Sequence, residues 1–304
     1  MCFRRSDGVK VKDLQVEEKM TPYFMPQRID AVNLFTHTIK CDKIDNFVKE
    51  EKLRTGTHFT YTVLLIAAFV RMLYQRPKLN RFVNNCVIYQ RNYISISLTI
   101  KKKLVDEGED VSLKFYFKGN ESLYDVKKIV EEEITKNVKV DEKTDTDKTA
   151  KFLGKLPNWL MKFAMWCVRF MDKHNILPKS LIRVSPFHTS LYLTDVRSIK
   201  LDKVYHHLYN FGTTSIFSAL GKAKYRPMQT VDGETKFEKT MDLGFTLDER
   251  VADGLYYANS VRLLQKYLEN PALLCERLPE PEDLKKRKKK LKIKKQKKNN
   301  KKES

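Results

Sequence analysis

Residues 219–274 decide the fold: ALGKAKYRPMQTVDGETKFEKTMDLGFTLDERVADGLYYANSVRLLQKYLENPALL. Two strands are predicted in and just before this stretch, over residues 215–221 and 239–247. A long helix is predicted over residues 253–270, with apolar positions that include Tyr256, Ala258, Val261, Leu264 and Leu268. The chain shows no internal repeat and no glycine-rich phosphate loop.

The rest of the chain predicts further strands and helices in mixed order. The helix Tyr61–Gln75 is apolar nearly all round, so we expect it to be central and buried, capped by Thr60 and ended by Pro77. Further strands are predicted over residues 31–39, 83–90, 93–101, 111–117 and 187–194, and further helices over 41–51 and 123–137. Because strands and helices do not alternate regularly, the order favours an α+β layered domain with a mixed, largely antiparallel sheet.

The composition predicts a globular protein in a reducing compartment. Of the 304 residues 41% are hydrophobic, and the longest apolar run, VLLIAAFV at 63–70, is far shorter than the ~18 residues of a membrane span. The first ten residues show no signal peptide. The five cysteines (Cys2, Cys41, Cys86, Cys167 and Cys275) form no CxxC pair, which indicates reduced thiols and no metal site. We therefore expect a cytoplasmic protein.

The strong positive charge is concentrated in a lysine-rich tail. The net charge is +21, of which residues 285–303 supply +12 and the other residues +9. We expect residues 278–304 to be disordered and to bind polyanions without sequence preference. The tail has no interleaved aromatic residues for base stacking, so nucleic-acid binding rests on its charge alone.

Three parts are expected: an N-terminal arm over residues 1–20, one main domain over 21–277 and the tail. An apolar helix after Pro157 is expected inside an insertion at about 151–178. Its aromatic residues include Trp159, Phe163, Trp166 and Phe170, and its basic neighbours are Lys155, Lys162, Arg169 and Lys173. Three interpretations stay open: a helix packed over the core, contact with a membrane surface, or the wall of a hydrophobic substrate pocket.

Three segments resemble the catalytic core of the dihydrolipoyl acyltransferases of 2-oxoacid dehydrogenase complexes. RPKLNRFV at 76–83 resembles a Pro-x-Leu-Asn junction of that family, and SLYLTDVR at 190–197 sits where the family has a Thr-Phe-Thr-Ile-Ser-Asn-Leu-Gly strand. Residues 219–274 resemble the family's C-terminal stretch, whose strand ends in Asp-His-Arg-x-x-Asp-Gly. Here residues 248–254 read Asp-Glu-Arg-Val-Ala-Asp-Gly, with Glu249 in the place of the family's catalytic histidine.

The resemblance covers roughly residues 20–275 and implies a chloramphenicol-acetyltransferase-like two-layer sandwich. It also implies a homotrimer with an active site at each subunit interface and coenzyme A as co-substrate. We expect that no lipoyl-bearing domain precedes the core and that this chain carries no lipoyl attachment. By the same resemblance, Thr194 matches the residue that stabilises the tetrahedral intermediate, and Asp253 matches an aspartate that holds an arginine and the loop.

The substitution at Glu249 leaves the chemistry open. A histidine base suits neutral pH, whereas a glutamate, with an ordinary pKa near 4.3, needs burial to become a comparable base. Glu249 as a substituted base, Glu249 in an ion pair with Arg250 or another cation, and a different reaction are three alternatives. His188 is expected to lie too far from Thr194 to replace the histidine, which leaves His206 and His207 as other candidates.

Two functions therefore remain. The first is an acyl-coenzyme A-dependent acyltransferase with a noncanonical base. The second is a catalytically inactive trimer that acts as a binding or assembly protein. A buried, unpaired Glu249 would favour the first, and a Glu249 paired with arginine would favour the second.

Overall fold

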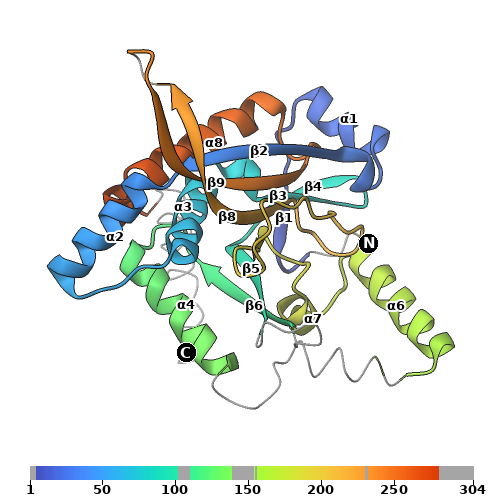
Figure 1. Ribbon diagram of the computed structural model, residues 1–304. Helices are drawn as coiled ribbons and strands as arrows, with labels where there is room; N and C mark the ends of the chain where they lie inside the picture. The colour runs from blue at the N-terminus through green and yellow to red at the C-terminus, as the bar shows by residue number, and fades with distance from the viewer. Residues whose placement is uncertain (1–4, 102–109, 139–153, 155, 230–231, 281–304) are drawn as a thin grey trace, which may run out of the picture.

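A six-stranded mixed sheet forms the centre of the computed structural model, which describes residues 5–101, 110–138, 154, 156–229 and 232–280. The strand order is β2-β9-β8-β7-β5-β6 (Figure 1). β7 pairs in parallel with both β5 and β8, and the other pairs are antiparallel. The strands are β2 (Val32–Lys40), β5 (Ile94–Lys101), β6 (Asp110–Phe117), β7 (Leu191–Asp195), β8 (Ile216–Gln229) and β9 (Thr235–Asp248).

A layer of helices buries one face of this sheet. α3 (Tyr61–Gln75) lies between α4 and α8 and is buried along most of its length, as its all-round apolar sequence predicts. Its Phe69 ring meets Phe245 of β9 edge-on at 6.1 Å. The other elements of the layer are α2 (Asp42–Thr55), α4 (Leu123–Val138), α8 (Gly254–Glu269), η2 (Pro77–Asn80) and η3 (Pro271–Leu274). The predicted α+β class with a mixed, largely antiparallel sheet is confirmed.

The loop over residues 196–215, between β7 and β8, packs closely on the opposite face of the sheet, and we call it the loop over the sheet. The carbonyl oxygen of Asp202 lies only 1.2 Å from where a Cβ on Gly221 would be, so only glycine fits there. Further along the loop, Leu208 packs with Tyr192 and Phe217 in a small second core. The loop is thereby held against β7, β8 and β9.

A second, three-stranded sheet joins the N-terminus to the middle of the chain. It has the order β1-β4-β3, with β1 (Gly8–Lys10), β3 (Arg81–Asn84) and β4 (Val87–Arg91). The single strand predicted over residues 83–90 is wrong, because the chain reverses at Asn85 and Cys86, whose φ angles are 48° and 57°. Residues 5–10, expected within an arm, contribute β1 and two buried side chains, and α1 (Val16–Phe24) and η1 (Ile29–Ala31) follow.

The expected insertion at about 151–178 contains α6 (Asn158–Lys173), which extends outward from the body of the protein (Figure 1), and α7 (Lys179–Val184) follows it. β7 begins at Leu191, later than predicted, because the preceding residues form a turn rather than a strand. None of the helices in the described ranges is long and apolar enough to cross a membrane. Residues 281–304, most of the expected tail, lie outside the described residues.

Candidate active site

The loop between β9 and α8 is held by a buried carboxylate, Asp248. Arg250 donates to it twice, from Nε to Oδ1 at 2.8 Å and from Nη2 to Oδ2 at 2.7 Å. Arg28 adds a second cation, with Nε 3.8 Å from Oδ2. The Tyr257 hydroxyl donates to the Asp248 backbone carbonyl at 2.8 Å. Because a bidentate arginine pair fixes both position and orientation, the loop has one defined geometry.

The two arginines also connect the loop to other elements. Arg250 Nη1 donates to the carbonyl oxygens of Met25 and Pro26, both at 3.1 Å. Arg28 donates from Nη1 to the carbonyl oxygens of Tyr209 and Asn210 and from Nη2 to that of Val83, at 3.1 to 3.3 Å. Burial lowers the pKa of Arg28 to about 10, although Asp248 opposes this effect, so the guanidinium stays charged at neutral pH.

Glu249 lies on the surface between the two buried residues Asp248 and Arg250. Its backbone N–H donates to the carbonyl oxygen of Ala31 at 2.9 Å, which fixes the loop against the start of β2. Within the described part of the chain, its carboxylate makes no ion pair. Glu249 is therefore neither buried nor paired with arginine in the single chain, so it meets neither of the two conditions set by the sequence analysis.

Asp253 begins α8 as its N-cap. Its Oδ1 accepts a hydrogen bond from the backbone N–H of Tyr256 at 2.8 Å, as capping aspartates do. The carboxylate that holds an arginine at this loop is that of Asp248, five residues earlier. Asp253 thus positions the helix that follows Glu249.

Thr194 lies on β7, opposite Thr99 of β5 and Ala219 of β8. Its hydroxyl is buried and has no hydrogen-bond partner among the described residues. Ala219 in turn pairs with Gly244 of β9, five residues before Glu249. At about 3.3 Å per residue and about 4.8 Å per strand, Thr194 and Glu249 lie roughly 19 Å apart in one chain. One chain alone does not bring the two residues together.

Beside the loop lies a buried ionic network that the sequence did not predict. Arg5 donates to Asp7 at 2.6 Å and is paired with Asp172, at the end of α6, at 2.8 Å. His188 Nε2 lies 3.3 Å from the other Asp172 oxygen. Burial favours the neutral carboxyl of Asp172, but His188 and Arg5 outweigh it and lower its pKa to about 2. Burial lowers the pKa of His188 despite Asp172.

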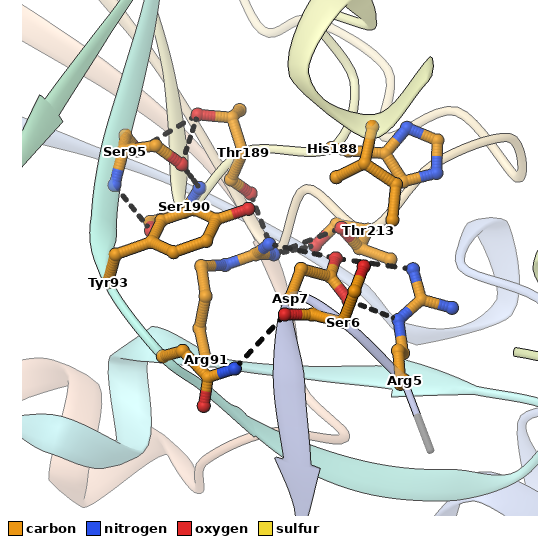
Figure 2. A network of polar contacts seen from close by, with 12 residues as sticks. Arg5, Ser6, Asp7, Arg91, Tyr93, Ser95, His188, Thr189, Ser190 and Thr213 are labelled. Atoms are coloured by element: carbon orange, nitrogen blue, oxygen red, sulfur yellow. Dashed lines mark hydrogen bonds and ion pairs between the residues drawn. The ribbon is translucent and has the colours of Figure 1, made fainter. Parts of the chain in front are cut away.

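Figure 2 shows how this network extends through Arg91. Arg91 Nη2 donates to the carbonyl oxygens of Thr189 at 3.0 Å and Thr213 at 2.9 Å, and its Nη1 is 3.6 Å from Asp7. Thr189 in turn donates to the Ser95 carbonyl oxygen at 2.8 Å. The network thereby joins the residues just before β1 to β4, β5 and the segment before β7. Its members are scattered from residue 5 to residue 213, so no local sequence motif predicts the network.

Two cavities border the loop between β9 and α8. A cavity of about 560 Å³ lies between Arg28, Arg250, Asp172 and the β3–β4 turn. A groove of about 550 Å³ lies between β2 and α8 and includes Gly254, Tyr257 and His37. His37 of β2 was not among the predicted site residues. Its Nε2 is buried without a partner in the described residues, and burial lowers its pKa. Its signal, a histidine on a predicted strand, is too common to single it out.

The other histidine candidates lie on the loop over the sheet. His206 stacks on Phe217 with ring centroids 4.3 Å apart, and burial lowers its pKa. His207 borders a small enclosed space next to Tyr192. In the described ranges no cluster of histidine, cysteine and acidic residues could hold a metal ion.

Comparisons with known proteins agree on the fold. Residues 210–276, from the end of the loop over the sheet through α8, match the family model of the 2-oxoacid dehydrogenases acyltransferase (catalytic domain). A search of curated protein sequences finds no match.

Among solved structures, the chain is similar to a probable dihydrolipoamide acetyltransferase from Listeria monocytogenes 4b F2365, at 12% identity and a TM-score of 0.53, over 86% of this chain and 94% of that one. It is also similar to the cubic core of a pyruvate dehydrogenase multienzyme complex, at 11% identity and a TM-score of 0.53, over 87% of this chain and 94% of that one. A third similar structure is a chloramphenicol acetyltransferase, at 11% identity and a TM-score of 0.51, over 86% of this chain and 99% of that one. The predicted chloramphenicol-acetyltransferase-like fold is confirmed, and so is the resemblance to the acyltransferase family over residues 210–276.

Proposed function

We propose that this protein is an acyltransferase of the 2-oxoacid dehydrogenase catalytic-domain type, which transfers an acyl group to or from coenzyme A and uses Glu249 as its base. The observation that carries the proposal is the geometry of the β9–α8 loop. Asp248 and Arg250 fix the loop, Asp253 caps the next helix, and Glu249 between them presents a carboxylate that makes no ion pair in the described chain. Because these hydrogen bonds fix the loop around one exposed carboxylate, they support a functional role for Glu249 rather than that of an ordinary surface charge.

The second half of the site would come from a neighbouring subunit of a homotrimer. Glu249 and Thr194 lie roughly 19 Å apart in one chain, so a shared site needs Thr194 of another copy. α1 offers an apolar surface for such an assembly, with Val16, Met20, Tyr23 and Phe24 all exposed. A neighbour that covers Glu249 would also remove water from its carboxylate, which strengthens a carboxylate as a base.

The proposed reaction follows from these two groups. Glu249 takes the proton from the thiol of the acceptor, and the thiolate attacks the carbonyl carbon of the acyl-coenzyme A thioester. The Thr194 hydroxyl, which has no partner among the described residues, donates a hydrogen bond to the oxyanion that forms. The tetrahedral intermediate then expels the coenzyme A thiolate, which recovers the proton from Glu249. A dithiol such as dihydrolipoamide is the acceptor we would test first.

The test is the replacement of Glu249 by glutamine, which keeps the shape of the side chain but cannot take the proton. We expect Glu249→Gln to lower coenzyme A release from acetyl- and butyryl-coenzyme A by about 100-fold or more, with the trimer unchanged. Glu249→His should retain activity, because the rest of the motif is in place. Glu50→Gln, an exposed glutamate on α2, is the matched control and should leave the rate unchanged.

Three outcomes would contradict the proposal. Full activity in Glu249→Gln would exclude the base role and direct attention to His206 and His207. A stable monomer at micromolar concentration in sedimentation would exclude the shared site. A wild-type trimer that transfers no acyl group would favour the alternative function, a catalytically inactive binding or assembly protein.

A further inference from the structure

α6 carries a row of aromatic side chains that the protein leaves exposed. The exposed fractions are 70% for Trp159, 57% for Phe163, 59% for Trp166 and 46% for Phe170. Their spacing of four, three and four residues places them within an arc of about 60° on the helix. The rings stack along this arc, with centroids 6.1 Å apart for Phe163 and Trp166 and 5.5 Å for Trp166 and Phe170. We call these four residues the aromatic stripe.

The aromatic stripe is not the side of α6 that packs on the protein. The half-buried residues of the helix include Met161, Ala164, Met165 and Val168, which lie on the opposite side of the helical wheel. Asp172, on the same general side, is the one buried residue of α6 and joins it to Arg5 and His188. Because α6 already has a packing face, the stripe is a second apolar surface with nothing to cover it in the described chain.

The charges beside the aromatic stripe indicate which kind of surface it binds. Lys162, Arg169 and Lys173 are exposed and line one edge of the stripe. The helix contains a single acidic residue, Asp172, and it is buried in ion pairs. A second copy of this positively charged chain would place like charges against this edge. An aromatic stripe with a cationic border matches instead the boundary between the head groups and acyl chains of an anionic membrane, where Trp and Lys are favoured.

We propose that α6 binds the surface of anionic lipid bilayers, with the aromatic stripe inserted at the head-group level and the cationic edge among the lipid phosphates. The proposal does not depend on acyl transfer. α6 extends from the body of the protein (Figure 1), so the stripe can reach a flat surface without unfolding of the core. The lysine-rich tail, with a charge of +12, would add electrostatic attraction but carries no aromatic residue to insert.

The chain provides its own probe for the test. Trp159 and Trp166 are its only two tryptophans, so intrinsic tryptophan fluorescence reports on α6 alone. We expect vesicles of phosphatidylglycerol and phosphatidylcholine to shift the emission of the full chain to shorter wavelength and to protect it from acrylamide. Vesicles of phosphatidylcholine alone should do so far more weakly.

Matched variants distinguish insertion of the aromatic rings into the bilayer from electrostatic attraction to the anionic lipids. Phe163→Ser should weaken partition onto the anionic vesicles by about tenfold or more, because it removes one inserted ring. Lys162→Gln should weaken it by about fivefold. Phe237→Ser, which removes a ring that is 64% exposed on β9, is the control and should bind as the wild type does.

Each other outcome overturns the proposal. Vesicles that sediment with the chain but leave its fluorescence unchanged would show that the tail alone binds lipid. Emission that is already shifted and protected without vesicles, and that reverses on dilution, would show that a second copy covers the stripe. A fluorescence change with single-stranded RNA and none with vesicles would make the stripe a base-stacking surface.

Discussion

α3 and α6 have similar sequences in one respect and opposite environments. Both are apolar around most of their circumference, yet α3 is buried along most of its length whereas in α6 only Asp172 is buried. Each helix contains one buried charged residue that joins it to the rest of the protein. Arg71 of α3 donates to the carbonyl oxygens of Glu121 and Glu276, and Asp172 of α6 pairs with Arg5 and His188. An apolar helix therefore needs an apolar surface to pack against, but its sequence does not show whether that surface is the core of the same protein or lies outside it.

The largest effect is expected in α3. Phe69→Ala removes a fully buried ring that contacts Phe245 and should lower the free energy of unfolding by about 3–5 kcal/mol. Urea denaturation followed by circular dichroism measures this loss. A loss below 1 kcal/mol would mean that α3 is not the centre of the core, and the contrast with α6 would fail.

A smaller but still large effect is expected where α6 meets the protein. Asp172→Ala leaves Arg5 and His188 without a shared carboxylate in a buried site and should cost about 3 kcal/mol. Lys173→Ala, the exposed next residue, is the control and should cost less than about 0.5 kcal/mol. Equal effects of the two substitutions would show that α6 is not held through Asp172.

The attachment of α6 should also depend on pH. Burial lowers the pKa of His188 below its usual 6.5, so the unfolded chain takes up a proton on this residue at a higher pH than the folded chain does. The free energy of unfolding should therefore fall as pH decreases below about 6.5, by at most about 1.4 kcal/mol per pH unit for this group.

His188→Gln tests this pH dependence because glutamine does not titrate. Denaturation at pH 7.5, 6.5 and 5.5 should give a shallower slope in the variant than in the wild type. His37 and His206, whose pKa values burial also lowers, remain in both proteins and supply the residual slope. Identical slopes would show that His188 is protonated equally in the folded and unfolded states.

The smallest effect is expected on the aromatic stripe. Trp166→Ser should change the free energy of unfolding by less than about 0.5 kcal/mol in the absence of lipid, because the ring is largely exposed. The same denaturation experiment provides the measurement. A cost of 2 kcal/mol or more would mean that another surface of the protein or of a second copy buries the ring.

Much of the fold follows from local patterns. The all-round apolar sequence, the Thr60 cap and Pro77 predict α3 with its observed bounds, and β2, β5, β6 and α4 differ from prediction by at most one residue at each end. The β3–β4 hairpin was missed because it depends on two non-glycine residues with positive φ, a conformation that sequence patterns seldom reveal. β1 was missed because a three-residue strand has no period to detect and forms only when β4 is beside it.

In the loop around Glu249, too, some features follow from the sequence and others depend on tertiary contacts. The sequence identified the order Asp248, Glu249, Arg250 and Asp253, and its resemblance to the acyltransferase family identified the missing histidine, because a motif is a local property of the chain. Only the tertiary structure decided that Asp248 rather than Asp253 holds the arginine, and that Arg28 joins them from another element. The same holds for the ionic network of Arg5, Asp172 and His188: buried charges are tolerated only where distant segments bring their partners together, and that distance cannot be read from the order of residues.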